Sequence, residues 1–256
     1  MKPFLSVIIP AYNEAERFTL TLVDVDRYLS NTEFSSEVII VNDGSTDKTA
    51  EIAENMANIM KNTRVIGWEK NKGKGVAVRH GMLEAKGNWR VFMDADNSTS
   101  ISEIEKMLPL FKEGYEVVIG SRAVYGAKLK PRQVWYKHLI GKAGNLFIQL
   151  FAIKGIKDTQ CGFKCFSEEA AEKIFSMCVT ARWGFDIEAL VLADKLGFKI
   201  KEMPVVWVND SRSRVRAIDY VGVILEVLKT RARLKGNKYN FQNAEDRKKH
   251  VLNNDE

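Results

Sequence analysis

The first half of the chain alternates between short apolar, β-branched runs and amphipathic segments, and this alternation limits the possible folds more than any other feature. Five runs are expected as strands, and the segments between them repeat apolar residues at helical spacing. The expected strands are Leu5–Ile9, Glu37–Val41, Arg64–Trp68, Trp89–Met93 and Glu116–Ile119, and the expected helices are Asn13–Leu29, Thr46–Met60, Lys74–Ala85 and Ser102–Phe111. Strands joined by such helices predict an α/β fold with a mainly parallel central sheet flanked by helices.

The second half has a less regular pattern. Long amphipathic helices are expected over Val134–Ile153 and Ile218–Leu234, each with basic residues at or near it. The shorter expected elements are Phe163–Phe166 and Lys199–Met203 as strands and Glu168–Phe175 and Phe185–Leu196 as helices. No repeat or linker divides the chain, so residues 1–235 are predicted to form one domain with C-terminal amphipathic helices. Residues 236–256 are polar and charged, which predicts a mobile tail.

Composition excludes several classes of protein. Hydrophobic residues make up 45% of the chain, which is typical of a globular protein and too high for a disordered one. Three cysteines in 256 residues are too few for a disulfide scaffold. The longest mostly apolar stretch, Leu146–Ile153, is far shorter than the roughly 18 to 20 residues of a spanning helix. The N-terminal apolar run is too short for a secretory signal, so we expect a cytoplasmic protein.

The charge balance points to an anionic partner without naming it. Lys and Arg number 39 against 33 Asp and Glu, which gives a net charge of +6. Such an excess is found on ordinary surfaces and on proteins that bind nucleic acid, phosphorylated small molecules or anionic membranes. A basic nucleic-acid-binding module would show an RNP, zinc-finger or helix-turn-helix pattern, and the sequence contains none of them. We therefore expect no nucleic acid partner.

Polar residues follow four of the five expected strands of the first half. These segments are Pro10-Ala11-Tyr12-Asn13-Glu14, Asn42-Asp43-Gly44-Ser45-Thr46-Asp47, Asp94-Ala95-Asp96 and Gly120-Ser121-Arg122. In an open parallel sheet, ligands bind outside the carboxyl ends of the strands. The pair Asp94 and Asp96 suits Mg²⁺ or Mn²⁺, which prefer carboxylate oxygens and keep positions open for phosphate and water. The alternatives are two solvated turn aspartates at Asp94 and Asp96, and turn or cap roles for Asp43 and Asp47.

Five motifs occur in order with consistent spacing: V-I-I-P-A-Y-N-E, V-N-D-G-S-T-D-K-T, N-K-G-K-G-V-A-V-R-H-G, M-D-A-D and G-S-R. Together they resemble family 2 glycosyltransferases over about residues 4–210. The resemblance implies the GT-A fold, a Rossmann-like sheet that binds a nucleotide sugar. The motifs at Asp158–Lys164 and Arg182–Glu188 are similar to the branch that makes polyprenyl-phosphate sugars. Within it they are nearest the dolichyl-phosphate β-glucosyltransferases, with the mannose synthases as near relatives.

The resemblance implies roles for the matching positions, with residues 1–122 as the nucleotide-sugar-binding half and residues 123–235 as the acceptor-binding half. Pro10, Tyr12 and Glu14 would line the base and ribose pocket, Asp43 would contact the base, and Lys74 would lie near the base and diphosphate. Asp94 would hold the donor sugar or the metal. Asp96 would bind the Mg²⁺ or Mn²⁺ that bridges the diphosphate. Related mannose synthases place a Gln ligand where this chain has Ser98, so a water would take that place here.

On the acceptor side, the resemblance assigns the lipid phosphate to Arg122 and Arg132. A basic loop that closes over the diphosphate would contain Arg212 and Arg214, and the resemblance does not separate the two. Asp186 and Glu188 would orient the donor sugar or the acceptor-side arginines. The alternative for both is that of helix N-terminal acids that complement the helix dipole.

The implied reaction moves glucose from UDP-glucose to a polyprenyl phosphate of the dolichyl type. A lipid phosphate is already an anion near neutral pH, so no general base is obligatory, and a single in-line attack inverts the anomeric centre to a β-linkage. The catalytic set is Asp94, Asp96, Arg122 and Asp186, which would align the reactants and stabilise the leaving diphosphate. GDP-mannose as donor stays open, as does an alcohol acceptor on a polysaccharide or protein with Asp186 or Asp158 as base.

A lipid acceptor gives the basic residues a further expected role. Cations cluster around the two long helices: Lys128, Lys130, Arg132, Lys137 and Lys142 at the first, and Arg231, Arg233 and Lys235 at the second. Basic amphipathic segments of this kind can lie on an anionic membrane surface. The alternative is that their apolar sides pack into the domain. We therefore expect a peripheral protein at the cytoplasmic face of a membrane.

Overall fold

The computed structural model describes residues 2–130, 148–149, 152–208, 217–236, 238–239, 248 and 251–252. The first half contains β1 (Leu5–Ala11), α1 (Phe18–Ser30), β2 (Ser36–Asp43), α2 (Thr49–Ala57), β3 (Thr63–Trp68), α3 (Lys74–Glu84), β4 (Trp89–Met93), the 3₁₀ helix η1 (Ile101–Lys106), α4 (Leu108–Lys112) and β5 (Val117–Ser121). All five predicted strands of this half are confirmed. The helix predicted over Ser102–Phe111 is wrong as one element. It divides into η1 and α4 because Pro109, which lacks a backbone N–H, fits only the first turn of a new helix.

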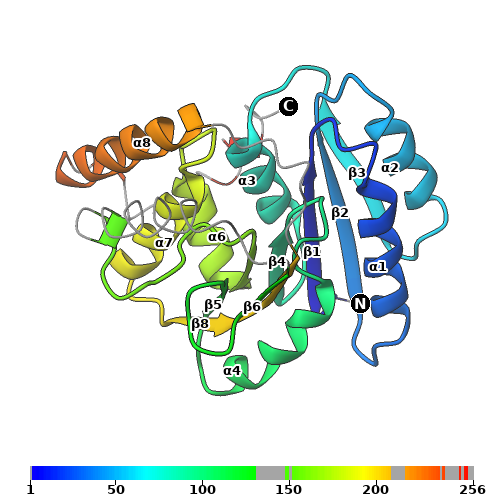
Figure 1. The fold of residues 1–256 in the computed structure, drawn as a ribbon, viewed down its shortest axis with the longest axis horizontal. Coiled ribbons are helices and arrows are strands. Elements are labelled where there is room, and N and C mark those ends of the chain that lie inside the picture. The colour runs from blue at the N-terminus through cyan, green and yellow to red at the C-terminus, as the bar shows by residue number, and fades with distance from the viewer. Residues whose placement is uncertain are drawn as a thin grey trace.

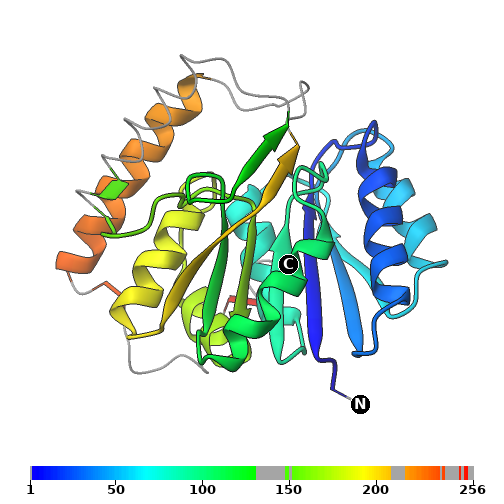
Figure 2. The ribbon, with the colours of Figure 1, turned by 60° about the horizontal axis from the view of Figure 1, so that its bottom comes forward.

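The second half contains β6 (Lys128–Lys130), β7 (Phe163–Ser167), α6 (Glu168–Met177), α7 (Phe185–Lys195), β8 (Ile200–Pro204), β9 (Val206–Val208) and α8 (Ala217–Lys235). The strands β6 and β9 were not predicted, since three residues are too few to show an alternating pattern. They pair in parallel as a small second sheet, drawn as the green and orange arrows at the top of Figure 2. Most of the helix predicted over Val134–Ile153 lies outside the described residues.

The main sheet has seven strands in the order β3-β2-β1-β4-β7-β5-β8. Its pairs are parallel except at β7, which runs antiparallel to both β4 and β5. The mainly parallel sheet is therefore confirmed, with one reversed strand, β7, between β4 and β5. The chain runs outward from β1 to β3 and then returns to place β4 on the other side of β1. This reversal puts a ligand crevice between the carboxyl ends of β1 and β4.

Helices cover both faces of the sheet (Figure 1). Along β1, alternate residues face opposite ways: Ile8 packs with α3, α6 and α7, whereas Val7 and Ile9 pack with α1, α2 and η1. Gly81 lets α3 approach the sheet, because a Cβ there would stand 2.5 Å from Ile8. Among the helices that the structure describes, none is long and apolar enough to cross a membrane.

The described residues of the predicted tail contact the rest of the domain. Tyr239 is buried, and the Lys248 ammonium donates to Glu172 of α6 at 2.5 Å. Val251 and Leu252 pack against the core on the α3 and α6 face. At these positions the segment is anchored to the domain.

Candidate active site

Asp94 stands directly after β4 and is fixed by the neighbouring strand β7. Its backbone N–H donates to the carbonyl of Gly162 at 3.1 Å. A Cβ at position 162 would lie 1.9 Å from the Asp94 carboxylate, so only glycine leaves room for that side chain. From α1, the Thr21 hydroxyl donates to the carbonyl of Ala95 at 2.7 Å and holds the turn between the two aspartates. The D-x-D segment is therefore clamped from both sides.

Asp96 faces a cation from the loop after β1. Its Oδ1 accepts from the backbone N–H of Ser98 at 2.9 Å, and its Oδ2 lies 3.5 Å from Arg17 Nη1. Arg17 also forms an ion pair with Glu14 through Nε, and its Nη2 donates to that carboxylate at 2.9 Å. Burial and the nearby Asp94 carboxylate raise the pKa of Asp96 above its ordinary value, although Ser98 and Arg17 oppose the rise. Two carboxylates that resist joint ionisation are a site that a cation would stabilise.

Lys74 supplies the cation nearest to Asp94. It begins α3, its Nζ donates to Asp94 Oδ1, and its ammonium lies 5.3 Å from the ring centre of Trp183. Burial lowers the pKa of Lys74, but the carboxylates of Asp94, Asp186 and Asp96 outweigh that effect, so the pKa is raised. Lys74 therefore stays an ammonium. With Glu14, Asp94 and Asp96, the Lys74 and Arg17 cations form what we call the donor cluster.

The donor cluster, as far as the structure describes it, offers a divalent metal a pair of carboxylates, Asp94 and Asp96, and no larger set of ligands. Within the described part of the chain, no group of three or more His, Cys, Asp and Glu side chains is placed to hold a metal. A pair of carboxylates suits Mg²⁺ or Mn²⁺, which often keep several ligands from water and phosphate. Directly beside Asp96, the Oδ1 of Asn97 is buried with no hydrogen-bond partner. An unsatisfied acceptor at this point fits the presence of a cation or its water.

Asp43 is buried at the end of β2 and organises the loop before α3. Its carboxylate accepts hydrogen bonds from Trp68 Nε1 at 2.7 Å, from Asn71 Nδ2 at 2.8 Å, and from the backbone N–H groups of Lys72 and Gly73 at 2.8 and 3.0 Å. These donors occupy most of the carboxylate's acceptor capacity. Asp43 thus holds residues 69–73 in place beside the crevice.

The loops after β1 and β2 are tied to each other. The Asn13 N–H donates to Ser45 Oγ at 3.1 Å, and the Thr46 N–H donates to Asn13 Oδ1 at 2.7 Å. The Glu14 N–H donates to Thr49 Oγ1 at 2.7 Å. Pro10 is buried within β1, and the Tyr12 side chain beyond it is exposed. The residues predicted for the nucleotide therefore share one loop assembly.

Arg122, after β5, forms a closed ion pair with Asp158. Its Nε and Nη2 donate to the two carboxylate oxygens at 2.7 and 2.9 Å, and its backbone N–H donates at 2.8 Å. Burial alone would raise the pKa of Asp158, but the Arg122 guanidinium and its hydrogen bonds lower it overall. We call these two residues the acceptor pair. The other arginines predicted here, Arg132, Arg212 and Arg214, lie outside the described residues.

Asp186 and Glu188 lie in the first turn of α7, and both are buried. The Lys164 ammonium, which is fully buried, donates to Asp186 Oδ1 at 2.6 Å and to the Cys161 carbonyl at 2.5 Å. Burial raises the pKa of Asp186, although Lys164 and Lys74 oppose it. Glu188 accepts from the backbone N–H groups of Val179 and Thr180 at 3.0 and 2.8 Å.

Sequence reasoning did not single out Arg17 or Lys164 as members of the site. The signal for Arg17 was its position three residues after Glu14, which permits an ion pair on one helical turn. The signal for Lys164 was its place in the motif at Asp158–Lys164, although its burial could not be inferred from that motif.

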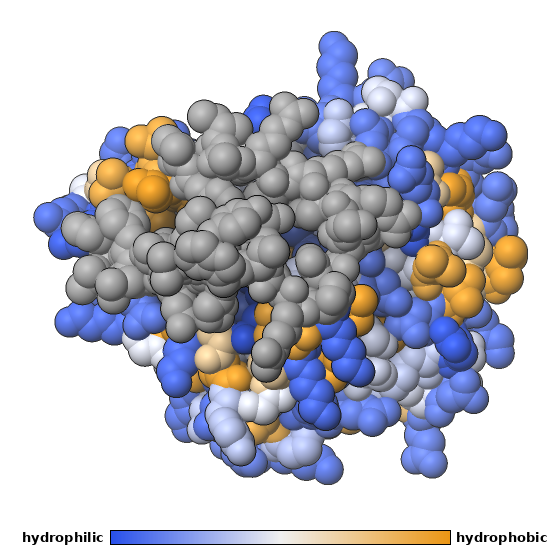
Figure 3. Space-filling model, viewed as in Figure 1, coloured by the Kyte–Doolittle hydropathy of each residue, from blue (hydrophilic) through white to orange (hydrophobic). Residues whose placement is uncertain are grey.

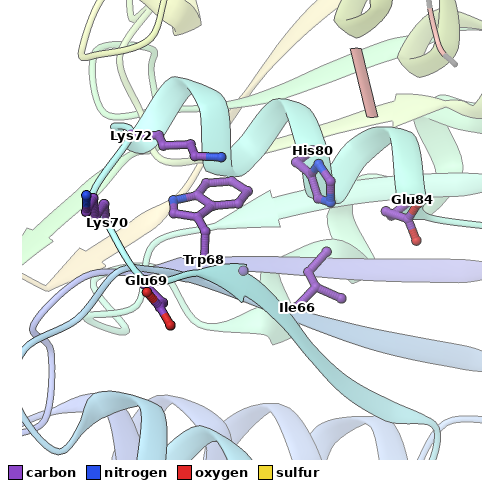
Figure 4. Close-up of a pocket in the computed structure, with 8 residues that line it drawn as sticks. Ile66, Trp68, Glu69, Lys70, Lys72, His80 and Glu84 are labelled. Carbon is purple, nitrogen blue, oxygen red and sulfur yellow. The ribbon is translucent and has the colours of Figure 1, made fainter. Parts of the chain in front are cut away.

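A pocket of about 670 Å³ lies at the sheet edge between β3 and α3 (Figure 4). Trp68 stands at its centre, with the Lys72 ammonium 4.7 Å from its ring centre and His80 in edge contact at 5.5 Å. The predicted site residues do not line this pocket. Its link to the crevice is the hydrogen bond from Trp68 to Asp43.

Several characterised proteins are similar to this chain in sequence. A dolichyl-phosphate beta-glucosyltransferase of Trichomonas vaginalis is 36% identical over 239 residues, which cover 87% of this chain and 71% of the relative. The enzyme of that name from Saccharomyces cerevisiae is 35% identical over 237 residues, covering 85% and 71%. The one from Homo sapiens is 33% identical over 224 residues, covering 82% and 69%.

Solved structures share the fold at lower sequence identity. Mannosyl-3-phosphoglycerate synthase from Rubrobacter xylanophilus matches with a TM-score of 0.68 at 16% identity, covering 94% of this chain and 77% of that one. Glucosyl-3-phosphoglycerate synthase from Mycobacterium tuberculosis, in complex with Mn²⁺, uridine diphosphate and phosphoglyceric acid, matches with a TM-score of 0.63 at 20% identity, covering 89% and 77%. Residues 6–175 match the sequence profile of glycosyl transferase family 2, and the chain therefore belongs to that family.

Proposed function

We propose that this protein transfers glucose from UDP-glucose to a dolichyl-type polyprenyl phosphate and inverts the anomeric centre. The observation that carries the proposal is the similarity to dolichyl-phosphate beta-glucosyltransferases of three distant organisms, at 33–36% identity over at least 82% of this chain. The mannose synthases are the second candidate within the branch, and the relatives' names favour glucose over mannose.

In this proposal the donor cluster binds the nucleotide diphosphate. Asp94 and Asp96 would hold Mg²⁺ or Mn²⁺, which would neutralise the charge that develops on the leaving diphosphate. Lys74 is the group that would contact the diphosphate directly, because its ammonium already stands between Asp94 and the Trp183 ring. The similar fold of an enzyme solved with Mn²⁺ and uridine diphosphate supports this assignment.

The acceptor pair would receive the lipid phosphate. Asp158 engages Nε and Nη2 of Arg122, so Nη1 is the guanidinium nitrogen left over for an incoming phosphate. The carboxylates considered as bases for an alcohol acceptor are Asp158 and Asp186, and each is held in an ion pair. A phosphate acceptor removes the need for a base, and it fits this arrangement better than an alcohol.

Association with a membrane surface is the part of the proposal that concerns α8. This helix exposes Ile224, Leu225 and Leu228 at 38%, 52% and 44%, beside the basic residues at its end. An apolar patch is visible over the position of α8 at the upper left of Figure 3. Wild-type protein should co-sediment with vesicles that contain phosphatidylserine, and a Leu225→Glu, Leu228→Glu variant should not. Equal sedimentation of both proteins would remove α8 from the proposal.

A donor screen tests the reaction itself. Purified protein is mixed with Mn²⁺ or Mg²⁺, dolichyl phosphate and labelled UDP-glucose, and the lipid phase is extracted and counted. Labelled lipid that requires both the metal and active protein is the expected result, with GDP-mannose as the competing donor in a parallel reaction. Label transferred from GDP-mannose alone would reassign the chain to the mannose synthases.

A further inference from the structure

Glu188 is a carboxylate with no exposure to solvent and with donors from three segments of the chain. The backbone N–H groups of Val179 and Thr180 bind its Oε2, at 3.0 and 2.8 Å. Its Oε1 accepts from the Tyr239 hydroxyl at 2.5 Å and from Arg233 Nη1 at 3.4 Å. A buried carboxylate is destabilising unless such donors surround it, so this arrangement ties the three segments together.

The first segment, residues 179–183, lies against the start of α3, and we call it the donor-site loop. The Gly75 N–H donates to the carbonyl of Ala181 at 2.8 Å. A Cβ would stand 2.4 Å from the Ala181 carbonyl oxygen at Gly73 and 2.2 Å from the Thr180 oxygen at Gly75. The residue between these glycines is Lys74, whose ammonium meets Trp183 at the end of the same loop. The loop thus forms the wall against which Lys74 is placed.

The other two segments come from the C-terminal part of the chain. Tyr239 is 2% exposed, although it lies in a segment of polar and charged composition. Arg233, in the last turn of α8, also donates to the Thr180 hydroxyl at 3.2 Å. At the other end of the loop, a Cβ at Gly184 would lie 2.5 Å from the Glu226 Cβ, so α8 packs directly on the backbone there.

From these contacts we infer that Tyr239, Arg233 and Glu188 are positioning residues for donor binding: the first two hold Glu188, and Glu188 holds the donor-site loop that places Lys74. This assignment differs from the expectations for Glu188, which were to orient the donor sugar or the acceptor-side arginines, or to complement the dipole of α7. It extends the functional unit to residue 239, beyond the residues 6–175 that match the family profile. The inference rests on the proposed function for its ligand, a nucleoside diphosphate.

The experiment compares Tyr239→Phe and Glu188→Gln with the wild type in the full-length protein. Isothermal titration of UDP in the presence of Mn²⁺ should give a Kd raised about three- to tenfold by Tyr239→Phe, the size of one ordinary hydrogen bond, because Tyr239 acts on the site only through Glu188 and the loop. Glu188→Gln should raise it further. In the transfer assay, the KM for UDP-glucose should rise while kcat at saturating donor changes less. The control is Tyr28→Phe, which also removes a tyrosine hydroxyl that interacts with a glutamate, Glu105, on the face of the sheet that α1 covers.

A second readout does not depend on the ligand. Arg182 is exposed within the donor-site loop, so tryptic cleavage after it reports how firmly the loop is held. Tyr239→Phe should speed this cleavage relative to Tyr28→Phe at equal thermal stability. Unchanged UDP affinity together with unchanged cleavage in Tyr239→Phe would overturn the inference. If the wild type itself fails to bind UDP, the proposed function falls, and the cleavage rates alone decide whether the loop is held as inferred.

Discussion

In the donor cluster, Asp94 pairs with Lys74 and Asp96 lies 3.5 Å from Arg17, whereas in the acceptor pair Arg122 and Asp158 engage each other through two parallel hydrogen bonds. The difference appears in their pKa values. Burial and a neighbouring carboxylate raise the pKa of Asp96. At Asp158 the effect of burial is outweighed by Arg122, and the pKa is lowered. Arg17 does not offset the burial of Asp96, whereas Arg122 more than offsets the burial of Asp158.

This difference separates two ways of preparing a site for phosphate. Among the described residues, the donor cluster sets three carboxylates, including Glu14, against two cations, a balance that an added cation would improve. In the acceptor pair the charges of Arg122 and Asp158 balance each other, and the two hydrogen bonds fix the orientation of the guanidinium. Its Nη1 group therefore has a defined direction without a further ion. Under the proposed function, a phosphate at the first site would come with a metal, and a phosphate at the second would meet the guanidinium directly.

The largest effect is expected from Asp96→Asn. The change keeps the shape of the side chain but removes the charge that would hold the metal, and losses of about 10²- to 10³-fold in kcat accompany the removal of one such electrostatic group. Initial rates of lipid labelling, with Mn²⁺ varied from zero to saturation, measure the effect. The matched control is Asp194→Asn on the exposed face of α7, which should leave the rate unchanged. A rate for Asp96→Asn within threefold of the wild type would break the donor side of the comparison.

A smaller and selective effect is expected from Arg122→Lys. The lysine ammonium is a single point charge. It cannot form a bidentate ion pair with Asp158 and also donate an N–H to the acceptor phosphate in the geometry of a guanidinium. The KM for dolichyl phosphate should rise about tenfold, the size of one hydrogen bond to a charged group. The Kd for UDP should stay the same, since the donor cluster is untouched. An equal loss of UDP affinity would show that the two sites are not separate in this way.

Features of the fold that depend on neighbouring residues in the sequence could be predicted, and features that depend on distant residues could not. The strand β4 and the aspartates after it were predicted because the apolar run ends at Met93 and the acids follow at once. The reversed direction of β7 was not predicted, because a five-residue strand carries no sign of its direction in its sequence. The order of the elements and most strand ends could therefore be predicted from the hydrophobic pattern. The direction in which the strands pair required the structure.

The candidate site divides in the same manner. Asp94, Asp96 and Lys74 were predicted from motifs, and the structure brings them together. The partner of Arg122 is Asp158, 36 positions away, and no local pattern links two residues at that separation. Lys164 was missed because a lysine is ordinarily placed at the surface, and its burial depends on two partners that the structure reveals, the Asp186 carboxylate and the Cys161 carbonyl.

The smallest expected effect is the dependence of stability on pH at the acceptor pair. Because the folded-state pKa of Asp158 lies below that of an unfolded aspartate, about 3.9, the pair stabilises the fold fully above that value. Its contribution is lost as the pH falls through the lowered folded-state pKa. The free energy of unfolding in urea should therefore differ between wild type and Asp158→Asn by a constant amount from pH 7 to 5. This difference in unfolding free energy should narrow below about pH 4, as the Asp158 carboxylate begins to bind a proton.

Asp194→Asn serves as the control, and its difference from the wild type should stay near zero throughout, since that side chain is exposed. A gap between wild type and Asp158→Asn that stayed constant down to pH 3 would mean that the Asp158 charge contributes nothing through Arg122, and the contrast between the two sites would then rest on geometry alone.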